Sequence, residues 1–318
     1  MNFNEMKVLV TGASGFLGAH VVRALLKEGA HVIAAHRQGS NTWRLDAIEK
    51  SLNGLIHETV DLASKNTIEN AMQEHKPNVI VNCAAYGVDY RQQVCEEAIQ
   101  SNITAVSWLI DAAKKFGVSR FIQIGTCYEY GNQAEALTEK ACLHPQGIYS
   151  VTKASGTLLA LDYAKSIGVP LVVLRPFGMY GPLEGEHKFV PMLFKACMHN
   201  EAIDLTKGEQ LRDYLYVEDA ASAILTMAAI TDFPNGEIFN LASGIPLKLR
   251  DFGEAAQAVI GQGILNWGAK PYRTDEMMSV IANIDKLKTY AGWQPRISLA
   301  QGLSLTFKEI ESRVETIQ

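Results

Sequence analysis

The chain has 318 residues, enough for one large domain or for a domain with an added lobe. Its 47% hydrophobic and 20% charged residues are ordinary for a globular protein, and its net charge of -5 gives no electrostatic reason to bind nucleic acid or an anionic membrane. No apolar run reaches the ~20 residues of a membrane helix, and the five scattered cysteines fit a reducing cytoplasm and argue against a structural zinc.

The N-terminal residues predict a β-α-β unit. Residues 7–11 read as a short buried strand, 19–28 as an apolar-periodic helix and 30–35 as a second strand. A Gly-x-x-Gly-x-x-Gly loop joins the first strand to the helix, and its glycines let the backbone approach a pyrophosphate at the helix N-terminus. We therefore expect a dinucleotide to contact Gly12, Ser14, Gly15, Phe16, Leu17 and Gly18.

The end of the second strand bears on the choice of cofactor. Proteins that prefer NAD place an acidic residue there to hold the adenosine ribose hydroxyls. This chain has no acid between Ala34 and Ser40, and Arg37, helped by His36 or Ser40, can bind a 2′-phosphate. The sequence thus favours NADP(H) and leaves NAD(H) open.

Strand and helix patterns alternate as far as residue 175. Further strands are expected at 79–82, 120–125 and 171–175, and helices at 68–74, 97–115 and 149–166. Such alternation predicts an α/β fold of the Rossmann type, with a doubly wound parallel sheet.

After residue 175 the pattern becomes irregular and rich in Pro and Gly, which indicates a smaller substrate-binding lobe. The helix expected at 217–229 returns to the sheet. We therefore assign residues 1–175 and about 212–243 to a dinucleotide-binding domain, and residues 176–211 and 244–318 to a discontinuous lobe.

Tyr149 and Lys153 are the clearest chemical signal in the chain. They are four residues apart on the expected helix and share one of its faces. An ammonium beside a phenol favours the phenolate, so we expect Lys153 to lower the pKa of Tyr149 from its ordinary value of about 10. Such a phenol is a usable acid or base nearer to neutral pH.

Several motifs in the same order resemble the extended short-chain dehydrogenase/reductase family, and in particular its nucleotide-sugar branch of epimerases, dehydratases and ketoreductases. The likeness includes Thr-Gly-Ala-Ser-Gly-Phe-Leu-Gly at 11–18, Thr126 after a strand, and Tyr149-x-x-x-Lys153. Arg-Pro-Phe-Gly-Met-Tyr-Gly-Pro at 175–182 and Arg-Asp-Tyr-Leu-Tyr-Val-Glu-Asp at 212–219 extend it along nearly the whole chain.

The resemblance implies a role for each central residue. Thr126 is expected to hydrogen-bond the reacting oxygen, Tyr149 to exchange a proton with it, and Lys153 to bind the nicotinamide ribose. Hydride is expected to move between a sugar carbon and the nicotinamide. The other implied cofactor contacts are Asp61, Leu62, Cys83, Ala84, Ala85, Asn102, Pro176 and Met179.

The substrate expected from the resemblance is a nucleotide sugar. Arg212 is the expected diphosphate ligand, since a guanidinium forks onto phosphate oxygens, and its alternative is an ion pair with Asp213. Gly178 stands where the family has an asparagine, so the contact of that asparagine is absent or supplied elsewhere. The remaining expected substrate contacts are Tyr86, Thr126, Cys127, Tyr128 and His187.

The segment after Thr126 narrows the reaction. Dehydratases of the family carry an Asp-Glu pair there, whereas this chain has Cys127 and Tyr128, so a 4,6-dehydratase would lack its acid and base. Glu129 is expected to point away from the site if the segment is extended, because side-chain direction alternates along a strand. A packed neutral thiol is the expectation for Cys127.

The absence of the ribose acid favours an NADP(H)-dependent reductase that acts at C4 of a nucleotide-linked 4-keto-6-deoxyhexose. An NAD-dependent nucleotide-sugar 4-epimerase is the alternative. A reductase of a non-nucleotide carbonyl and a dinucleotide-sensing or scaffold protein are two further possibilities. By analogy with the family, the helices at 97–115 and 149–166 are expected to pair two chains into a homodimer.

Overall fold

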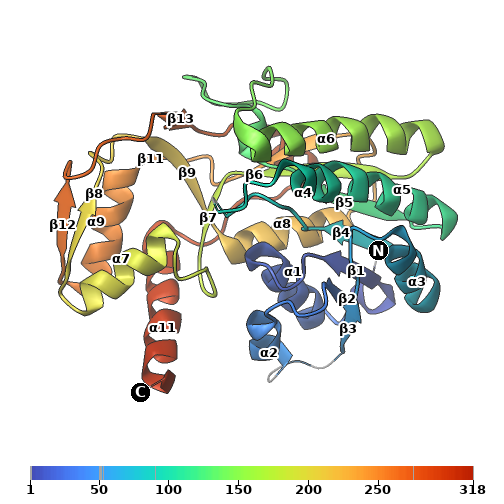
Figure 1. Ribbon diagram of the computed structural model, residues 1–318, viewed down its shortest axis with the longest axis horizontal. Helices are drawn as coiled ribbons and strands as arrows, with labels where there is room; N and C mark the ends of the chain where they lie inside the picture. The colour runs from blue at the N-terminus through green and yellow to red at the C-terminus, as the bar shows by residue number, and fades with distance from the viewer. Residues whose placement is uncertain (1, 50–51, 53, 90, 275, 318) are drawn as a thin grey trace.

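The computed structural model, which describes residues 2–49, 52, 54–89, 91–274 and 276–317, contains a parallel sheet of seven strands (Figure 1). The strands lie in the order β10-β6-β5-β4-β1-β2-β3. Their bounds are β1 Lys7–Thr11, β2 His31–His36, β3 Leu55–Thr59, β4 Val79–Asn82, β5 Arg120–Ile124, β6 Leu171–Pro176 and β10 Ile238–Leu241. The strand order reverses between β1 and β4, which is where doubly wound sheets bind ligands.

Helices cover both faces of this sheet because alternate strand residues point to opposite sides. Val8 and Val10 of β1 pack with α1 (Phe16–Lys27) and α8 (Val217–Ala229). Leu9, between them, packs on the other face in a core that includes residues of α3 (Lys65–His75), α5 (Ala105–Lys115) and α6 (Gly147–Ile167). The predicted α/β fold with a parallel sheet is confirmed.

Two stretches of the larger part differ from the expected elements. The single helix expected at 97–115 is three consecutive segments, α4 (Cys95–Ile99), the π-helical η2 (Gln100–Thr104) and α5. The structure also has β3 and α2 (Trp43–Glu49), neither of which was predicted from the sequence.

The remaining chain forms a smaller part around a second sheet, in which β9 (Leu211–Tyr216) pairs with β7 (Gly178–Tyr180), β11 (Pro246–Lys248) and β13 (Ser279–Val280). A two-stranded pair, β8 (Ala202–Leu205) and β12 (Ile264–Trp267), lies beyond it. The helices of this part are α7 Phe189–Met198, α9 Leu249–Ile260, α10 Asp285–Ala291 and α11 Leu299–Ile317.

The boundary expected near residue 212 falls at the start of β9, a strand of the smaller sheet, whereas α8 and β10 belong to the larger core. In Figure 1 the smaller part lies beside the carboxyl ends of the large-sheet strands, with α7, α9 and α11 grouped together. Within the described residues, every helix is too short or too polar to cross a membrane.

Candidate active site

A cavity of about 930 Å³ opens at the carboxyl ends of β1, β2, β4 and β5. Thr11, His36, Cys83 and Ile124, from the ends of these strands, all line it. Except for Asn102, every cofactor contact expected from the sequence lines this cavity: Gly12, Ser14, Gly15, Phe16, Leu17, Gly18, His36, Arg37, Ser40, Asp61, Leu62, Cys83, Ala84, Ala85, Tyr149, Lys153, Pro176 and Met179.

The glycine loop fits tightly between β1 and α1. A Cβ atom added at Gly18 would collide with the carbonyl oxygen of Gly12, so only glycine fits that position. Gly15 precedes the helix as its N-cap and has no side chain to occupy the first N–H groups of α1. Those donors and the positive end of the helix dipole are therefore free to bind a phosphate group.

The part of the cavity next to the end of β2 carries basic and polar side chains. The end of β2 and the loop after it, all within the described residues, contribute His36, Arg37 and Ser40 to the lining and no carboxylate. His57 of β3 lies beside them, with its Nδ1 atom 3.2 Å from Nε2 of His36. The sequence did not indicate His57, because β3 itself was not predicted.

Arg44 of α2 is a second residue that the sequence analysis missed. Its Nη1 atom donates to the carbonyl oxygen of Ser14 in the glycine loop at 3.1 Å. Its Nε atom donates to the carbonyl oxygen of Leu183 at 2.8 Å. Arg44 thus ties the glycine loop to the segment that follows β7, and no local pattern could have shown this contact.

Tyr149 and Lys153 line the cavity, and Thr126 follows Gly125, which lines it as well. The side chain of Thr126 lies close enough to the phenol of Tyr149 to lower its pKa against the larger effect of burial. The buried ammonium of Lys153 donates to the carbonyl oxygen of Ile124 at 2.6 Å. The helix face that carries Tyr149 and Lys153 therefore lies against the end of β5, as their spacing predicts.

The structure contradicts the expected lowering of the Tyr149 pKa. Burial of the half-buried ring raises this pKa above its usual value, although the side chain of Thr126 acts in the opposite direction. Burial also lowers the pKa of Lys153, and its ammonium is bonded to Ile124 rather than to the phenol. Desolvation of the phenol thus outweighs the effect of the neighbouring lysine.

The segment after Thr126 is not extended, so the condition on which the direction of Glu129 was predicted is not met. It forms a 3₁₀ turn, η3 (Cys127–Glu129), capped by the side chain of Thr126. Glu129 does point away from the cavity, because it pairs with Arg175 in the core at 2.8 Å. Cys127 is buried, and burial raises its pKa to about 12, which keeps it a neutral thiol as expected.

Tyr128 and Tyr86 lie where a substrate could meet them. Tyr128 is 39% exposed, and its ring is edge-on to that of Tyr149 with centroids 6.3 Å apart. Tyr86 lines the cavity. Asn102, expected at the cofactor, instead accepts a hydrogen bond from the Tyr86 N–H and donates to the Tyr86 carbonyl, both at 2.9 Å. Asn102 therefore fixes this loop and does not line the cavity.

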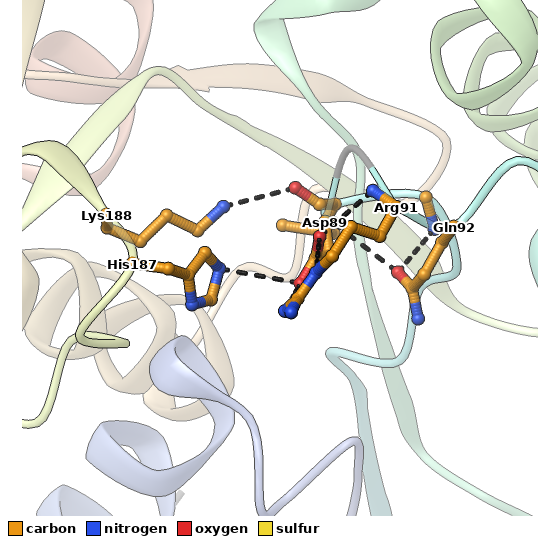
Figure 2. A network of polar contacts seen from close by, with 7 residues as sticks. Asp89, Arg91, Gln92, His187 and Lys188 are labelled. Atoms are coloured by element: carbon orange, nitrogen blue, oxygen red, sulfur yellow. Dashed lines mark hydrogen bonds and ion pairs between the residues drawn. The ribbon is translucent and has the colours of Figure 1, made fainter.

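His187 connects two loops through its contact with Asp89 (Figure 2). Its Nε2 atom lies 3.5 Å from a carboxylate oxygen of Asp89, which also pairs with Arg91. The neighbouring Lys188 donates to the carbonyl oxygen of Val88 at 3.2 Å, and Val88 lines the cavity. His187 thus joins the loop after β4 to the segment before α7 and does not itself line the cavity.

Arg212 pairs with a residue that the sequence analysis did not consider. Its Nη2 atom lies 2.9 Å from a carboxylate oxygen of Glu276, whereas the buried Asp213 accepts hydrogen bonds from the N–H groups of Ser243 and Gly244. The alternative pairing of Arg212 with Asp213 is therefore wrong. The positive charge of Arg212 lowers the pKa of Tyr128 against the larger effect of burial, which raises it, so the two residues are neighbours.

Gly178 lies where the backbones of β7 and β9 approach closely. A Cβ atom at this position would lie 2.8 Å from the carbonyl oxygen of Asp213. A side chain as large as asparagine does not fit without a backbone shift, so any contact of that kind comes from elsewhere in this chain.

Comparison with known proteins places these features in context. The profile of the NAD-dependent epimerase/dehydratase family matches residues 8–242. The chain is 28% identical to UDP-glucuronate 4-epimerase of Thermodesulfobacterium geofontis over 98% of each protein. It is 26% identical to dTDP-glucose 4,6-dehydratase of Haemophilus influenzae, over 95% of this chain and 97% of that protein.

A solved structure of UDP-glucuronic acid 4-epimerase from Bacillus cereus, in complex with UDP-glucuronic acid and NAD, is similar over 97% of this chain and 100% of that chain. Its TM-score is 0.85, at 26% sequence identity.

Proposed function

This chain belongs to the NAD-dependent epimerase/dehydratase family, and from that premise we propose that it transfers hydride at C4 of a nucleotide-linked hexose. One observation carries the proposal: Tyr149 and Lys153 line the same cavity as the glycine loop, and Thr126 lies beside the phenol. A single dinucleotide can therefore reach from the loop to the phenol.

Each residue has a distinct part in the proposed reaction. When bound, the nicotinamide supplies or accepts the hydride. Tyr149 donates a proton to the C4 oxygen during reduction or removes it during oxidation, and the Thr126 hydroxyl holds the same oxygen. Lys153, fixed by Ile124, places a positive charge beneath the phenol and beside the expected ribose position.

For the specific reaction, we favour NADP(H)-dependent reduction of a 4-keto-6-deoxyhexose. His36, Arg37 and Ser40, with His57 beside them, suit a 2′-phosphate, and a reductase consumes free NADPH in each turnover.

An NAD-dependent 4-epimerase is the second candidate. The observation in its favour is the similarity to two UDP-glucuronate 4-epimerases, one of them solved with NAD. The dehydratase relative does not lead to a third candidate, because Cys127 and Tyr128 are not carboxylates and burial raises the pKa of each to about 12.

The substrate diphosphate is proposed to bind Arg212, which would exchange its ion pair with Glu276 for phosphate oxygens. Tyr86 and Tyr128 are proposed to border the sugar. We further propose a homodimer through α4 and α6, where Ile99, Val151 and Leu158 are exposed apolar side chains.

The cofactor is the first measurement. The purified protein is denatured, any released nucleotide is identified by mass, and the apo-protein is titrated with NADPH and NADH. Empty protein that prefers NADPH supports the reductase and directs screening to 4-keto-6-deoxy nucleotide sugars. Stoichiometric NAD carried through purification, with no preference for NADPH, would make the epimerase the leading function.

A further inference from the structure

We propose that Glu129 is a positioning residue, which holds Thr126 and the catalytic face of α6 in register from beneath the active site. Glu129 is the last residue of η3, and its carboxylate is fully buried in the core. It therefore touches neither the expected substrate position nor the expected cofactor position. The inference rests on the proposed hydride-transfer function, since it concerns the geometry of Thr126 and Tyr149.

The carboxylate of Glu129 connects three segments of the larger part of the molecule. Its Oε1 atom accepts hydrogen bonds from the N–H of Thr126 and from the hydroxyl of Thr157, both at 2.9 Å. Its Oε2 atom accepts from Nε of Arg175 at 2.8 Å. The end of β5, the middle of α6 and the end of β6 are thus bound to one fully buried group.

Thr157 lies on the same face of α6 as the catalytic residues. Tyr149, Lys153 and Thr157 follow one another at intervals of four residues, so their side chains line one stripe of the helix. Lys153 anchors this stripe to Ile124 and Thr157 anchors it to Glu129. A shift of the carboxylate would therefore move Thr126 and the Tyr149 helix relative to each other.

The ion pair with Arg175 fixes the carboxylate in turn. Burial would lower the pKa of Arg175, but Glu129 and Tyr130 together outweigh it and hold this pKa above its usual value. The guanidinium lies over the ring of Tyr130 at 4.6 Å, and the Tyr130 hydroxyl donates to Asn240 at 2.7 Å. Gly125 provides the necessary space, because a Cβ atom there would lie 2.6 Å from Oε1 of Glu129.

The negative charge of Glu129 also acts on the two catalytic groups. It raises the pKa of Lys153 against burial, and it adds to the burial that raises the pKa of Tyr149. The other groups that act on the pKa of Tyr149 are Thr126, which caps η3, and Cys127 and Tyr128 within it. Removal of this one charge should therefore lower the pKa of the Tyr149 phenol.

The test begins with Glu129→Gln, which keeps the size of the side chain and removes its charge. The kcat for the nucleotide sugar should fall roughly 10- to 100-fold, because a misplaced reacting group loses that much rate, while the Kd for the dinucleotide stays within about twofold. The matched control is Glu135→Gln on the exposed loop after η3, which should retain wild-type kcat. A wild-type kcat in Glu129→Gln would overturn the proposal.

A double variant separates positioning from stability. Replacing a buried ion pair by apolar residues often restores stability, so Glu129→Leu combined with Arg175→Met should fold even if the single variant does not. Its kcat should stay low although its Tm returns toward the wild-type value. Recovery of kcat together with Tm would mean that the pair is only structural.

Thr157→Val removes the hydrogen bond from the Thr157 hydroxyl to Glu129 and keeps the shape of the side chain. This variant should lower kcat severalfold.

An activity-independent readout distinguishes this inference from the function itself. Tyrosine labelled with ¹³C at Cζ, with the Tyr149 signal assigned from Tyr149→Phe, reports the pKa of the phenol by NMR. Glu129→Gln should shift that pKa downward, and an unchanged pKa would refute the electrostatic part of the role. If the wild type turns over no nucleotide sugar but the shift occurs, the proposed function fails and the action of Glu129 on Tyr149 stands.

Discussion

The phenol of Tyr149 is the residue on which the proposed chemistry depends. It is half-buried, lies close to the side chain of Thr126 and stands four residues before the buried Lys153 on α6. The proposed chemistry can be tested by removing the oxygen of the phenol alone.

Tyr149→Phe should bind the dinucleotide with unchanged Kd and lose roughly 10²- to 10⁴-fold in kcat, the usual contribution of a positioned general acid or base. Calorimetric titration and steady-state rates measure the two quantities. Tyr163→Phe on the same helix is the control, because its hydroxyl bonds Asp111 outside the cavity. Full activity in Tyr149→Phe would refute the assigned role.

A second prediction at the scale of the residue concerns Glu184 and the pH dependence of the stability of the protein. Burial raises its pKa to about 8, although Lys188 and Arg44 favour the charged form, and its Oε2 atom is buried without a hydrogen bond. A folded-state pKa above the unfolded value means that the folded state binds more protons between pH ~4.5 and ~8. The stabilisation from this group is therefore complete at low pH and is lost as pH rises through about 8.

Glu184→Gln should consequently have a higher Tm than the wild type at pH 9, by roughly 3 °C or more, and the gain should vanish at pH 4. Thermal unfolding of both proteins across this pH range checks it. Glu186→Gln, two residues along on the exposed surface, is the control and should show no such gain. A difference in Tm that is independent of pH would contradict the explanation.

At the scale of elements, the β1–loop–α1 unit was predictable because every contact that defines it is local. The strands β1, β4, β5 and β6 fall within one or two residues of expectation, since short apolar runs bounded by polar residues are buried on both faces. By contrast, β3 is an edge strand with mostly exposed or half-buried residues, so it lacks the apolar signal.

The helices of the smaller part were not predicted because their apolar residues are buried by contacts with elements distant in the sequence. Phe194 of α7, Phe252 of α9 and Leu303 of α11 share one core, yet they are far apart in the sequence. The same reason applies to the site. Tyr149 and Lys153 could be found from their spacing, and Thr126 from the family resemblance. Arg44 contacts Ser14 and Leu183, and Glu129 contacts Thr157 and Arg175, and no local pattern connects residues so far apart in the sequence.

The glycine loop gives the prediction at this scale. Gly18→Ala places a methyl group against the carbonyl oxygen of Gly12, so either the loop or the start of α1 must move. Dinucleotide affinity should fall at least roughly tenfold, equivalent to about 1.4 kcal/mol, in a protein that still folds. Fluorescence titration with NADPH and circular dichroism check the two parts, and wild-type affinity would show that the loop is not the phosphate site.

At the scale of the whole molecule, we propose that residues 1–175 with about 217–243 bind the dinucleotide and that the rest, including β9, forms the substrate lobe. Several side-chain contacts cross between the two. Arg44 donates both to the glycine loop and to the carbonyl oxygen of Leu183, and His187 pairs with Asp89. The buried Asp219 of α8 accepts from the N–H of Ile297. The cavity therefore has walls that are held by both parts of the chain, and its shape depends on their relative position.

The outer face of α6 carries the last prediction. Val151 and Leu158 are seven residues apart, 45% and 55% exposed, and lie on the opposite side of the helix from the buried Lys153 stripe, with α4 and α5 alongside (Figure 1). An apolar stripe on a long helix is covered at little cost by a second copy of itself, in a four-helix arrangement with isologous contacts.

Leu158→Glu would place an unpaired charge at the centre of that contact, which costs several kcal/mol. The dimer dissociation constant should therefore rise roughly 100-fold or more, as measured by sedimentation equilibrium. Leu305→Glu on α11, a similarly exposed leucine in the smaller part, should leave the dimer intact. A wild-type protein that sediments as a monomer at micromolar concentration would refute the interface outright, and dissociation by Leu305→Glu instead would move it to the other part of the molecule.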